Sequence, residues 1–335
     1  MAILVTGGAG YIGSHVAYEL VDASRDVIVL DNLSTGFAGA VPSSARLVIG
    51  DIADEALLCK VHPEHGIDAI IHMAGSVVVP ESITDPLGCY LNDTARSRTL
   101  MAFAVAAGIR RFIFSSRGLR NTSAIPVGED APLRPVSRYG TSKMMTELML
   151  GDTAKAHDLR YVALRYFNVA GADPAGRTGQ STRGATHLVK VACEAATGRR
   201  DGIDVFGMDY PTRDGTCIRD FIHAKDLALA HSRRSPLASG EQRTVTDAEL
   251  RLFKRLLRPR GDQSSGASIG ARAHGARRSQ APQRRHRDRR RLSPAALRAQ
   301  LDSAPRRHRW HRAGCLALGA RIGRQLAAVA VPHVC

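Results

Sequence analysis

The hydrophobic positions of this chain fall into short apolar runs that alternate with longer helical patterns over the first 231 residues. The runs contain few polar residues, which is typical of strands in a parallel sheet that helices cover on both faces. Strand and helix patterns in alternation predict βαβ units. We therefore expect an α/β fold with a doubly wound parallel sheet. The expected strands are residues 2–6, 27–31, 46–49, 68–72, 112–115 and 161–166, and the expected helices are 11–23, 53–62, 86–107 and 140–157.

A glycine-rich turn follows the first expected strand. Its sequence is TGGAGYIG, residues 6–13, and a helical pattern continues from Ser14. Glycines allow a tight turn and a close approach of the backbone to a pyrophosphate, while the free N–H groups of a helix N-terminus attract phosphate charge. The motif by itself is weak, because an ordinary strand-to-helix turn can carry the same glycines. Its place between a buried strand and a helix favours a dinucleotide site in a Rossmann fold.

The end of the second expected strand indicates which dinucleotide is bound. Asp31 ends this strand, 18 residues after Gly13, where Rossmann folds place the acid that hydrogen-bonds a ribose 2′-OH. Its carboxylate would repel a 2′-phosphate, and the sequence NLSTG at 32–36 has no arginine to bind one. We therefore expect NAD, and not NADP, as the cofactor.

Charge divides the chain into two parts of different character. The chain has 47 Lys+Arg and 31 Asp+Glu, a formal net charge of +16. Residues 1–231 contain 23 basic and 25 acidic residues, so the positive excess lies within residues 232–335. In that C-terminal part arginine is frequent, lysine is nearly absent, and no regular helical or strand period is present.

Two explanations fit the C-terminal part. Clustered arginines neutralise phosphates, so it could be a nucleic-acid-binding tail. Alternatively, an Arg- and Ala-rich stretch without periodicity is typical of a GC-rich gene read out of frame, and the composition favours this second explanation. We expect an NAD-binding domain over 1–168, to which 217–231 return. A smaller C-terminal substrate domain would comprise 169–216 and 232–335, the latter frame-shifted or disordered.

The sequence indicates neither a membrane protein nor a metal site. No signal peptide precedes the first strand and no apolar run is long enough to span a bilayer, so we expect a cytoplasmic protein. The six cysteines are scattered, without a C-x-x-C pair or a His/Cys spacing that fits a metal ion. We therefore expect no bound metal.

A tyrosine and a lysine form the candidate catalytic pair. Tyr139 and Lys143 are four residues apart in the sequence YGTSK, which places both on one face of a helix. A neighbouring ammonium favours the phenolate form of a tyrosine, which can then act as general base. A surface tyrosine beside a solvated lysine is the ordinary alternative. The dinucleotide turn upstream favours the catalytic interpretation.

Several motifs extend this pattern over residues 1–231. They are TGGAGYIGSH at 6–15, DNLS at 31–34, HMAG at 72–75, SRYGTSK at 137–143, RYFN at 165–168 and FGMDYPTRDGTCIRDFIH at 206–223. With these motifs the chain resembles the extended short-chain dehydrogenase/reductase superfamily and, within it, the UDP-glucose 4-epimerase family. The last motif distinguishes that family from other nucleotide-sugar enzymes better than the glycines do.

The resemblance implies an isomerase that interconverts UDP-galactose and UDP-glucose, in galactose metabolism or in the supply of exopolysaccharide precursors. Tyr139 would take the proton of the sugar 4-OH while the C4 hydride passes to tightly bound NAD⁺. The resulting 4-keto sugar turns over in the pocket, and the hydride returns to its opposite face. Lys143 would hold the nicotinamide ribose. The resemblance also implies a homodimer formed through two long helices of each subunit, here 86–107 and 140–157.

The resemblance also assigns residues to two binding sites. Those at dinucleotide-contacting positions are Gly7, Gly10, Tyr11, Ile12, Gly13, Asp31, Asn32, Leu33, Ser34, Thr35, Gly36, Asp51, Ile52, Met73, Ala74, Gly75, Asn92, Tyr139, Lys143 and Phe167. Those near the nucleotide sugar are Asn168, Leu188, Phe206 and Arg219, and Arg219 would pair with the diphosphate. Purely structural roles are the alternative for Asp51, Leu188 and Phe206, and are favoured for His15 and His72.

One departure from the family pattern follows the fifth expected strand. There the family has a Ser or Thr that hydrogen-bonds the substrate hydroxyl and relays its proton to the tyrosine. Arg117 stands at this position, and the usual sequence VYG after it is absent. The next stretch is about two residues short, as two compensating frame errors would produce. We expect strongly reduced turnover from the chain as written.

The second departure is the C-terminal part. In the family this part supplies the last strand of the sheet, much of the lid over the sugar, and an arginine that binds the diphosphate. None of these can be assigned within residues 232–335 from the sequence. We therefore expect the chain to bind NAD more readily than it epimerises.

Two alternative functions remain. A 4,6-dehydratase of the same superfamily carries an acidic pair directly after the Ser/Thr, and the sequence SRG at 116–118 has none. The alternative from another class is an inactive NAD-binding scaffold whose basic tail binds nucleic acid. Binding to RNA that weakens steeply with salt would indicate this scaffold.

Overall fold

A computed structural model describes residues 2–76, 81–117, 133–182, 184, 186–206, 209–210, 221–233, 243–246 and 289–292. They form two compact units. The first holds the described residues up to Val169 and those from Ile222 to Thr246, and the second holds those from Ala170 to Phe221 together with 289–292. Arg219 lies outside the described residues, as do most of 232–335 and the side chains of Arg117 and Phe206.

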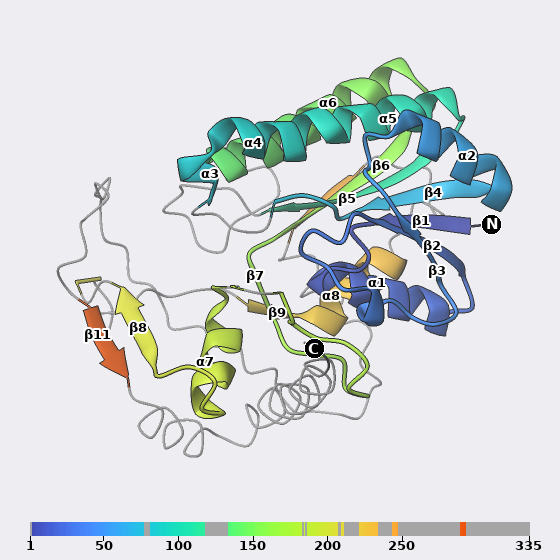
Figure 1. The fold of residues 1–335 in the computed structure, drawn as a ribbon. Coiled ribbons are helices and arrows are strands. Elements are labelled where there is room, and N and C mark those ends of the chain that lie inside the picture. The colour runs from blue at the N-terminus through green and yellow to red at the C-terminus, as the bar shows by residue number, and fades with distance from the viewer. Residues whose placement is uncertain are drawn as a thin grey trace, which may run out of the picture. The chain divides into compact units, whose positions relative to one another are not determined.

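A parallel sheet of seven strands forms the centre of the first unit (Figure 1), in the order β10-β6-β5-β4-β1-β2-β3. Chain order runs outward in both directions from β1, so the carboxyl ends of β1 and β4 flank a topological switch point, where such sheets bind ligands. The strands are β1 (Ala2–Thr6), β2 (Asp26–Asp31), β3 (Arg46–Ile49), β4 (Ile67–His72), β5 (Arg111–Arg117), β6 (Arg160–Tyr166) and β10 (Arg243–Thr246).

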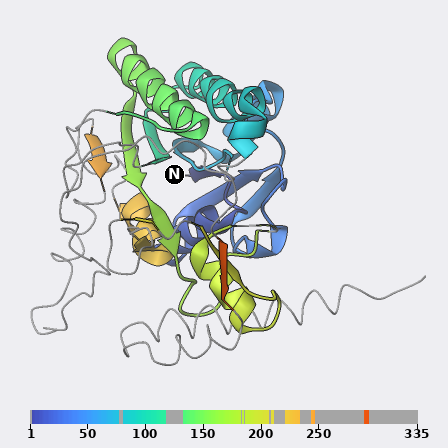
Figure 2. The same ribbon diagram turned by 90° about the vertical axis from the view of Figure 1, so that its left-hand side faces the viewer.

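Helices cover both faces of this sheet, which confirms the expected doubly wound α/β fold (Figures 1 and 2). On one face lie α2 (Glu55–His65), α5 (Arg96–Ala106) and α6 (Arg138–Ala156), and on the other lie α1 (Tyr11–Asp22) and α8 (Ala224–Arg233). Successive strand residues point to opposite faces. Leu4 and Ile70 therefore pack under one helical layer, while Val5 and Ile71 pack under the other. Six strands follow the sequence prediction, and β10 adds one in a segment where none was expected.

The expected helix 86–107 is interrupted. It consists of α4 (Pro86–Tyr90), a π-helical turn η2 (Leu91–Ala95), and α5; a short helix α3 (Glu81–Thr84) precedes it. Asp85 caps α4 by accepting a hydrogen bond from the Gly88 N–H at 2.9 Å. A π turn inserts one extra residue into a helix and is frequent at functional sites.

The second unit contains the helix α7 (Leu188–Ala196) and the strand β8 (Ile203–Phe206), which pairs antiparallel with β11 (Arg289–Leu292). A small apolar cluster of Ala195, Ala196 and Ile203 joins α7 to β8.

Two further short strands, β7 (Asn168–Ala170) and β9 (Phe221–His223), pair with each other. A 3₁₀ turn η1 (Ala38–Ala40) completes the assigned elements.

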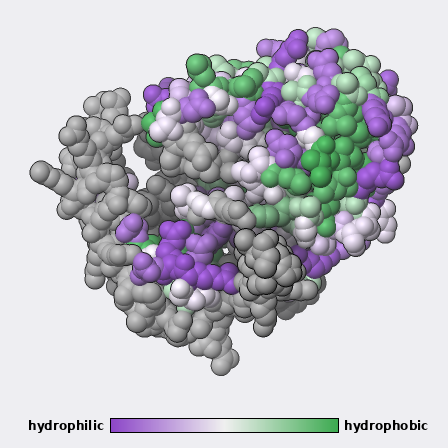
Figure 3. Space-filling model, in the orientation of Figure 1, coloured by the Kyte–Doolittle hydropathy of each residue, from purple (hydrophilic) through white to green (hydrophobic). Residues whose placement is uncertain are grey.

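The surface of the described residues is mixed in polarity. Figure 3 shows a band of hydrophobic residues across the first unit, with hydrophilic residues on either side. No helix in the described part of the chain has the length and apolar character needed to cross a bilayer.

Candidate functional site

The turn between β1 and α1 has no room for side chains at two of its glycines. Gly7 has a φ of +69°, and a Cβ built on it would lie 2.6 Å from the backbone nitrogen of Ala74. A Cβ built on Gly13 would lie 2.1 Å from the carbonyl oxygen of Gly7. Both positions therefore require glycine, the first for its conformation and the second for the close approach of the turn to α1.

The N-terminus of α1 is built to bind an anion. Gly10 is the N-cap residue and has no side chain to accept hydrogen bonds from the first turn, which also contains no acidic residue. The N–H groups of the first turn and the helix dipole therefore give this end a positive character that no acidic side chain of the turn offsets. This arrangement fits the pyrophosphate of a dinucleotide.

Asp31, the last residue of β2, is 8% exposed. Its Oδ2 accepts a hydrogen bond from the Ala9 N–H at 2.9 Å, and its Oδ1 accepts one from the Leu33 N–H at 2.8 Å. The first bond holds the carboxylate against the glycine turn, and the second fixes it to the segment after β2. Each oxygen keeps a lone pair for the hydroxyls of a ribose.

Asp51 and Asn92, two predicted cofactor residues, are joined by one arginine. Arg96 of α5 donates a hydrogen bond to Oδ1 of Asn92 at 2.9 Å and lies 3.3 Å from Oδ2 of Asp51. The Asn92 amide also donates to the Ser76 hydroxyl at 3.1 Å. This contact places Asn92 at the end of β4, beside the segment that contains Gly75.

A buried hydrogen-bond chain holds the carboxyl ends of β1 and β4. His72 is bonded through Nδ1 to Thr6 Oγ1 and through Nε2 to Ser97 Oγ, each at 2.8 Å. Ser97 donates its own proton to the carbonyl oxygen of Asp93 at 2.5 Å, so it accepts from the Nε2–H of His72. Burial, with a smaller effect from Lys143, lowers the pKa of His72 to about 3. His72 is thus a neutral structural residue.

Tyr139 and Lys143 lie on the first turns of α6, which begins after the N-cap residue Ser137. Ser137 accepts a hydrogen bond from the Gly140 N–H at 3.1 Å, which fixes the start of the helix. The Lys143 side chain is buried, and its Nζ lies 5.7 Å from the centre of the Tyr139 ring. The same Nζ would be 2.7 Å from a Cβ on Gly75. The structure therefore brings the Tyr–Lys pair to the carboxyl end of β4.

Two serines precede Arg117 at the end of β5, and both are engaged within the protein. Ser116 donates its proton to Oε1 of Glu147, and Ser115 shares a hydrogen bond with the Tyr166 hydroxyl. The single proton of Ser116 is thus used by Glu147. Ser116 does not replace the Ser or Thr that the family pattern has at position 117.

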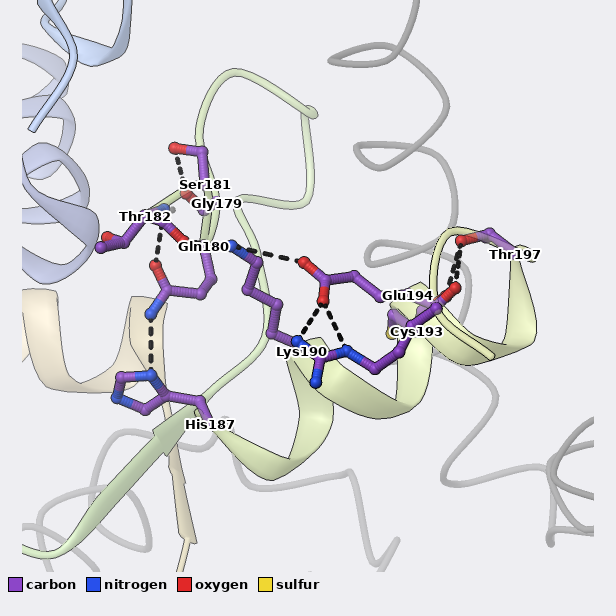
Figure 4. A network of polar contacts seen from close by, with 10 residues as sticks. Gly179, Gln180, Ser181, Thr182, His187, Lys190, Cys193, Glu194 and Thr197 are labelled. Atoms are coloured by element: carbon purple, nitrogen blue, oxygen red, sulfur yellow. Dashed lines mark hydrogen bonds and ion pairs between the residues drawn. The ribbon is translucent and has the colours of Figure 1, made fainter. Parts of the chain in front are cut away.

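The predicted substrate residue Leu188 begins α7 in the second unit, where this residue is 56% exposed. Figure 4 shows the polar contacts that fix this helix: Lys190 donates to the carbonyl oxygen of Thr182 and lies 3.5 Å from Glu194 Oε1. His187, the N-cap residue, is 3.1 Å from the Gln180 amide. The stretch 180–182 is thus bound to the helix that presents Leu188.

Sequence reasoning missed two buried polar groups near this site, Asp93 and Glu147. Asp93 is fully buried on η2, and Glu147 is buried on α6. One sequence signal existed for Glu147, because it follows Tyr139 and Lys143 at a further interval of four residues and so shares their helix face. No comparable signal distinguishes Asp93 from an exposed acid.

The remaining predicted residues occupy the same edge of the sheet or the second unit. Met73 and Ala74 follow β4, Phe167 follows β6, and Asn168 begins β7. Ile52 is a buried core residue. These assignments stay predictions, as do those of Phe206 and Arg219.

A glycine turn at a switch point, an acid held beside it and a Tyr–Lys pair on the adjoining helix define a class of protein: enzymes that use a nicotinamide dinucleotide to oxidise and reduce an alcohol carbon. The model of the NAD dependent epimerase/dehydratase family matches residues 3–237. The chain belongs to this family, which confirms the predicted fold class and cofactor.

The curated relatives that match are similar over the same part of the chain. The UDP-glucose 4-epimerase of Azospirillum brasilense is 55% identical over 231 residues, which are 68% of this chain and 66% of that protein. The UDP-glucose 4-epimerase of Halalkalibacterium halodurans is 43% identical over 233 residues, 69% of this chain and 70% of its own. The matched part thus spans about two thirds of the length of these relatives.

Solved structures match this chain over a similar share of its length. A UDP-glucose 4-epimerase from Brucella ovis, in complex with NAD, has a TM-score of 0.67 and 44% identity, covering 69% of this chain and 71% of its own. One from Bifidobacterium longum, in complex with NAD⁺ and UDP, has a TM-score of 0.68 and 32% identity, covering 73% and 77%.

Proposed function

We propose that this protein interconverts UDP-galactose and UDP-glucose as an NAD-dependent 4-epimerase. The observation that carries this proposal is the placement of Tyr139 and Lys143 on α6 beside Gly75, at the switch point of the sheet. The relatives named above, all UDP-glucose 4-epimerases, support the choice of substrate. The dehydratase alternative is not favoured, because no acidic pair follows Ser116.

Different residues of the first unit would bind different parts of the dinucleotide. The glycine turn and the N-terminus of α1 would bind the pyrophosphate, and the Asp31 carboxylate would accept hydrogen bonds from the adenosine ribose. Lys143 would donate hydrogen bonds to the nicotinamide ribose. When bound, the nicotinamide supplies a reversible acceptor for the hydride of the sugar C4.

Tyr139 would act as the general base. Its phenolic oxygen would take the proton of the 4-OH as the C4 hydride leaves, which converts the sugar into a 4-keto sugar. The adjacent Lys143 ammonium stabilises negative charge on that oxygen. On return of the hydride to the opposite face of C4, Tyr139 would give the proton back, and the configuration would be inverted without net oxidation.

The test is to purify the chain, denature it and measure the released NAD, and to follow UDP-glucose formation from UDP-galactose with a coupled dehydrogenase. We expect NAD to co-purify and UDP-glucose to form at a rate well below that of the Azospirillum relative, assayed in parallel. The absence of extracted NAD would refute the cofactor site. NAD without any turnover would instead support the inactive scaffold.

Arg117 is expected to limit this turnover, since the family has a proton-relaying Ser or Thr at its position. Replacing Arg117→Thr alone should nevertheless not restore normal turnover, because the residues after it, GLRN at 118–121, also depart from the family pattern. Steady-state kcat of the variant checks this. Full activity from the single change would show that the segment after β5 is otherwise intact.

We also propose a cytoplasmic homodimer. A groove of about 490 Å³ lies between α5 and α6, lined by Met101, Val105 and Met149 among others. On the same helix α6, Met145 and Leu148 are 41% and 57% exposed. Apolar side chains in this pattern along two adjacent helices suit helix packing against a second copy. Sedimentation equilibrium of the purified chain tests this assembly.

A further inference from the structure

Asp93 is a fully buried carboxylate that the proposed reaction does not use directly. It lies on the π turn η2, between α4 and α5. Its Oδ1 accepts a hydrogen bond from the Ser76 N–H at 2.5 Å, and its Oδ2 accepts one from the Ser142 hydroxyl at 2.9 Å. The Cys89 thiol lies 3.8 Å from Oδ2 as a third donor. A carboxylate with these donors is held in one orientation.

This carboxylate lies next to the Lys143 ammonium. A Cβ built on Gly75 would be 2.7 Å from Lys143 Nζ and 2.9 Å from Asp93 Oδ1, so both charged atoms lie close to one point beside Gly75. Ser142, which bonds Asp93, directly precedes Lys143 on α6. The π turn and α6 thus meet at this pair.

Three titratable groups act on Lys143 from the packed elements. Burial alone would lower the pKa of Lys143, but the charge of Asp93, then the effects of Tyr139 and Cys89, raise it above its usual value. Burial and Asp93 also raise the pKa of the Cys89 thiol, so it stays neutral. His72 is neutral as well. Among the described residues around Lys143, Asp93 thus has the largest effect in favour of the charged ammonium.

We propose that Asp93 is a positioning residue for Lys143: it fixes the ammonium between Gly75 and Tyr139 and keeps it charged for contact with the cofactor. This inference rests on the proposed function in one respect, namely that Lys143 touches bound NAD. A buried ammonium without a partner would lose its proton or leave the site.

The test is the pH dependence of NAD affinity in Asp93→Asn, with the full chain freed of NAD and titrated with NAD⁺ from pH 7 to 10. Asn keeps the shape and the Ser76 contact but removes the charge. The affinity of the parent chain for NAD⁺ should change little over this pH range. In the variant, Lys143 should deprotonate within it, and each further pH unit should weaken binding by up to about tenfold.

Ser142→Ala is the matched control, since it removes a hydrogen bond to Asp93 and no charge. We expect Ser142→Ala to lower the affinity for NAD⁺ by the same factor at every pH of the range. An Asp93→Asn profile parallel to the parent's would overturn the proposal. Failure of the parent to bind NAD at any pH would refute the cofactor site instead, so the two failures are distinguishable.

A comparison of two other variants covers the case in which Asp93→Asn does not fold. Lys143→Met alone leaves a buried carboxylate without its counter-ion, whereas Lys143→Met combined with Asp93→Asn leaves a neutral pair. We expect the double variant to unfold at a higher temperature than Lys143→Met. A double variant that unfolds at the same temperature as Lys143→Met, or at a lower one, would contradict the pairing.

Discussion

Replacing Tyr139→Phe should lower kcat by about 10²–10⁴-fold, the range that a positioned general base contributes. The phenyl ring retains the packing of Tyr139 but has no oxygen to take the 4-OH proton. The Lys143 ammonium, 5.7 Å from the ring centre, has donors but no acceptor and so cannot take this proton in place of Tyr139. Turnover of UDP-galactose by the variant and the parent, measured with the same coupled assay, checks this expectation.

Two controls accompany this measurement. NAD released on denaturation should be equal in Tyr139→Phe and the parent, which shows that the cofactor site is intact. Tyr161→Phe, near the amino end of β6 and hence away from the carboxyl ends that form the site, should leave kcat unchanged. If the kcat of Tyr139→Phe were within a factor of a few of the parent's kcat, Tyr139 would be excluded as the base.

Replacing Glu147→Ala should lower the free energy of unfolding by about 3–5 kcal/mol, because it breaks a buried ion pair by removing one partner. Arg165 donates from Nε to Glu147 Oε2 at 2.9 Å and also from its terminal nitrogen to the same carboxylate. The side chains of Arg165 and Glu147 are only 11% and 6% exposed. The substitution would remove this carboxylate from the buried guanidinium, and it would leave the hydroxyl of Ser116 buried without its acceptor.

Urea unfolding at one fixed NAD concentration measures this change, since bound cofactor itself adds stability. Asp152→Ala is the matched control on the same helix: its ion pair with Lys155 is 79% and 77% exposed, so its loss should cost no more than about 1 kcal/mol. If Glu147→Ala cost as little as Asp152→Ala, the buried pair would have no net structural role.

The sheet and the dinucleotide half of the site could be predicted from local sequence. Apolar runs such as Ile3–Val5 are continuous because helices cover both faces, and this pattern is visible without any knowledge of contacts. The glycine turn and Asp31 follow their strands directly, so chain order alone places them at one edge of the sheet. Tyr139 and Lys143 share a helix face because helical geometry relates residues four apart.

Other features depended on contacts between distant parts of the chain. The π turn within 86–107 leaves no mark on the hydrophobic pattern, and it brings Asp93 toward Ser142, 49 residues away. Glu147 similarly meets Ser116 of β5 and Arg165 of β6. In sequence these acids resemble exposed ones, because burial of a charge is decided by the partners that packing supplies. The residues around the proposed catalytic pair are therefore set by how α5, α6 and the sheet pack together, and the cofactor turn by the order of residues along the chain.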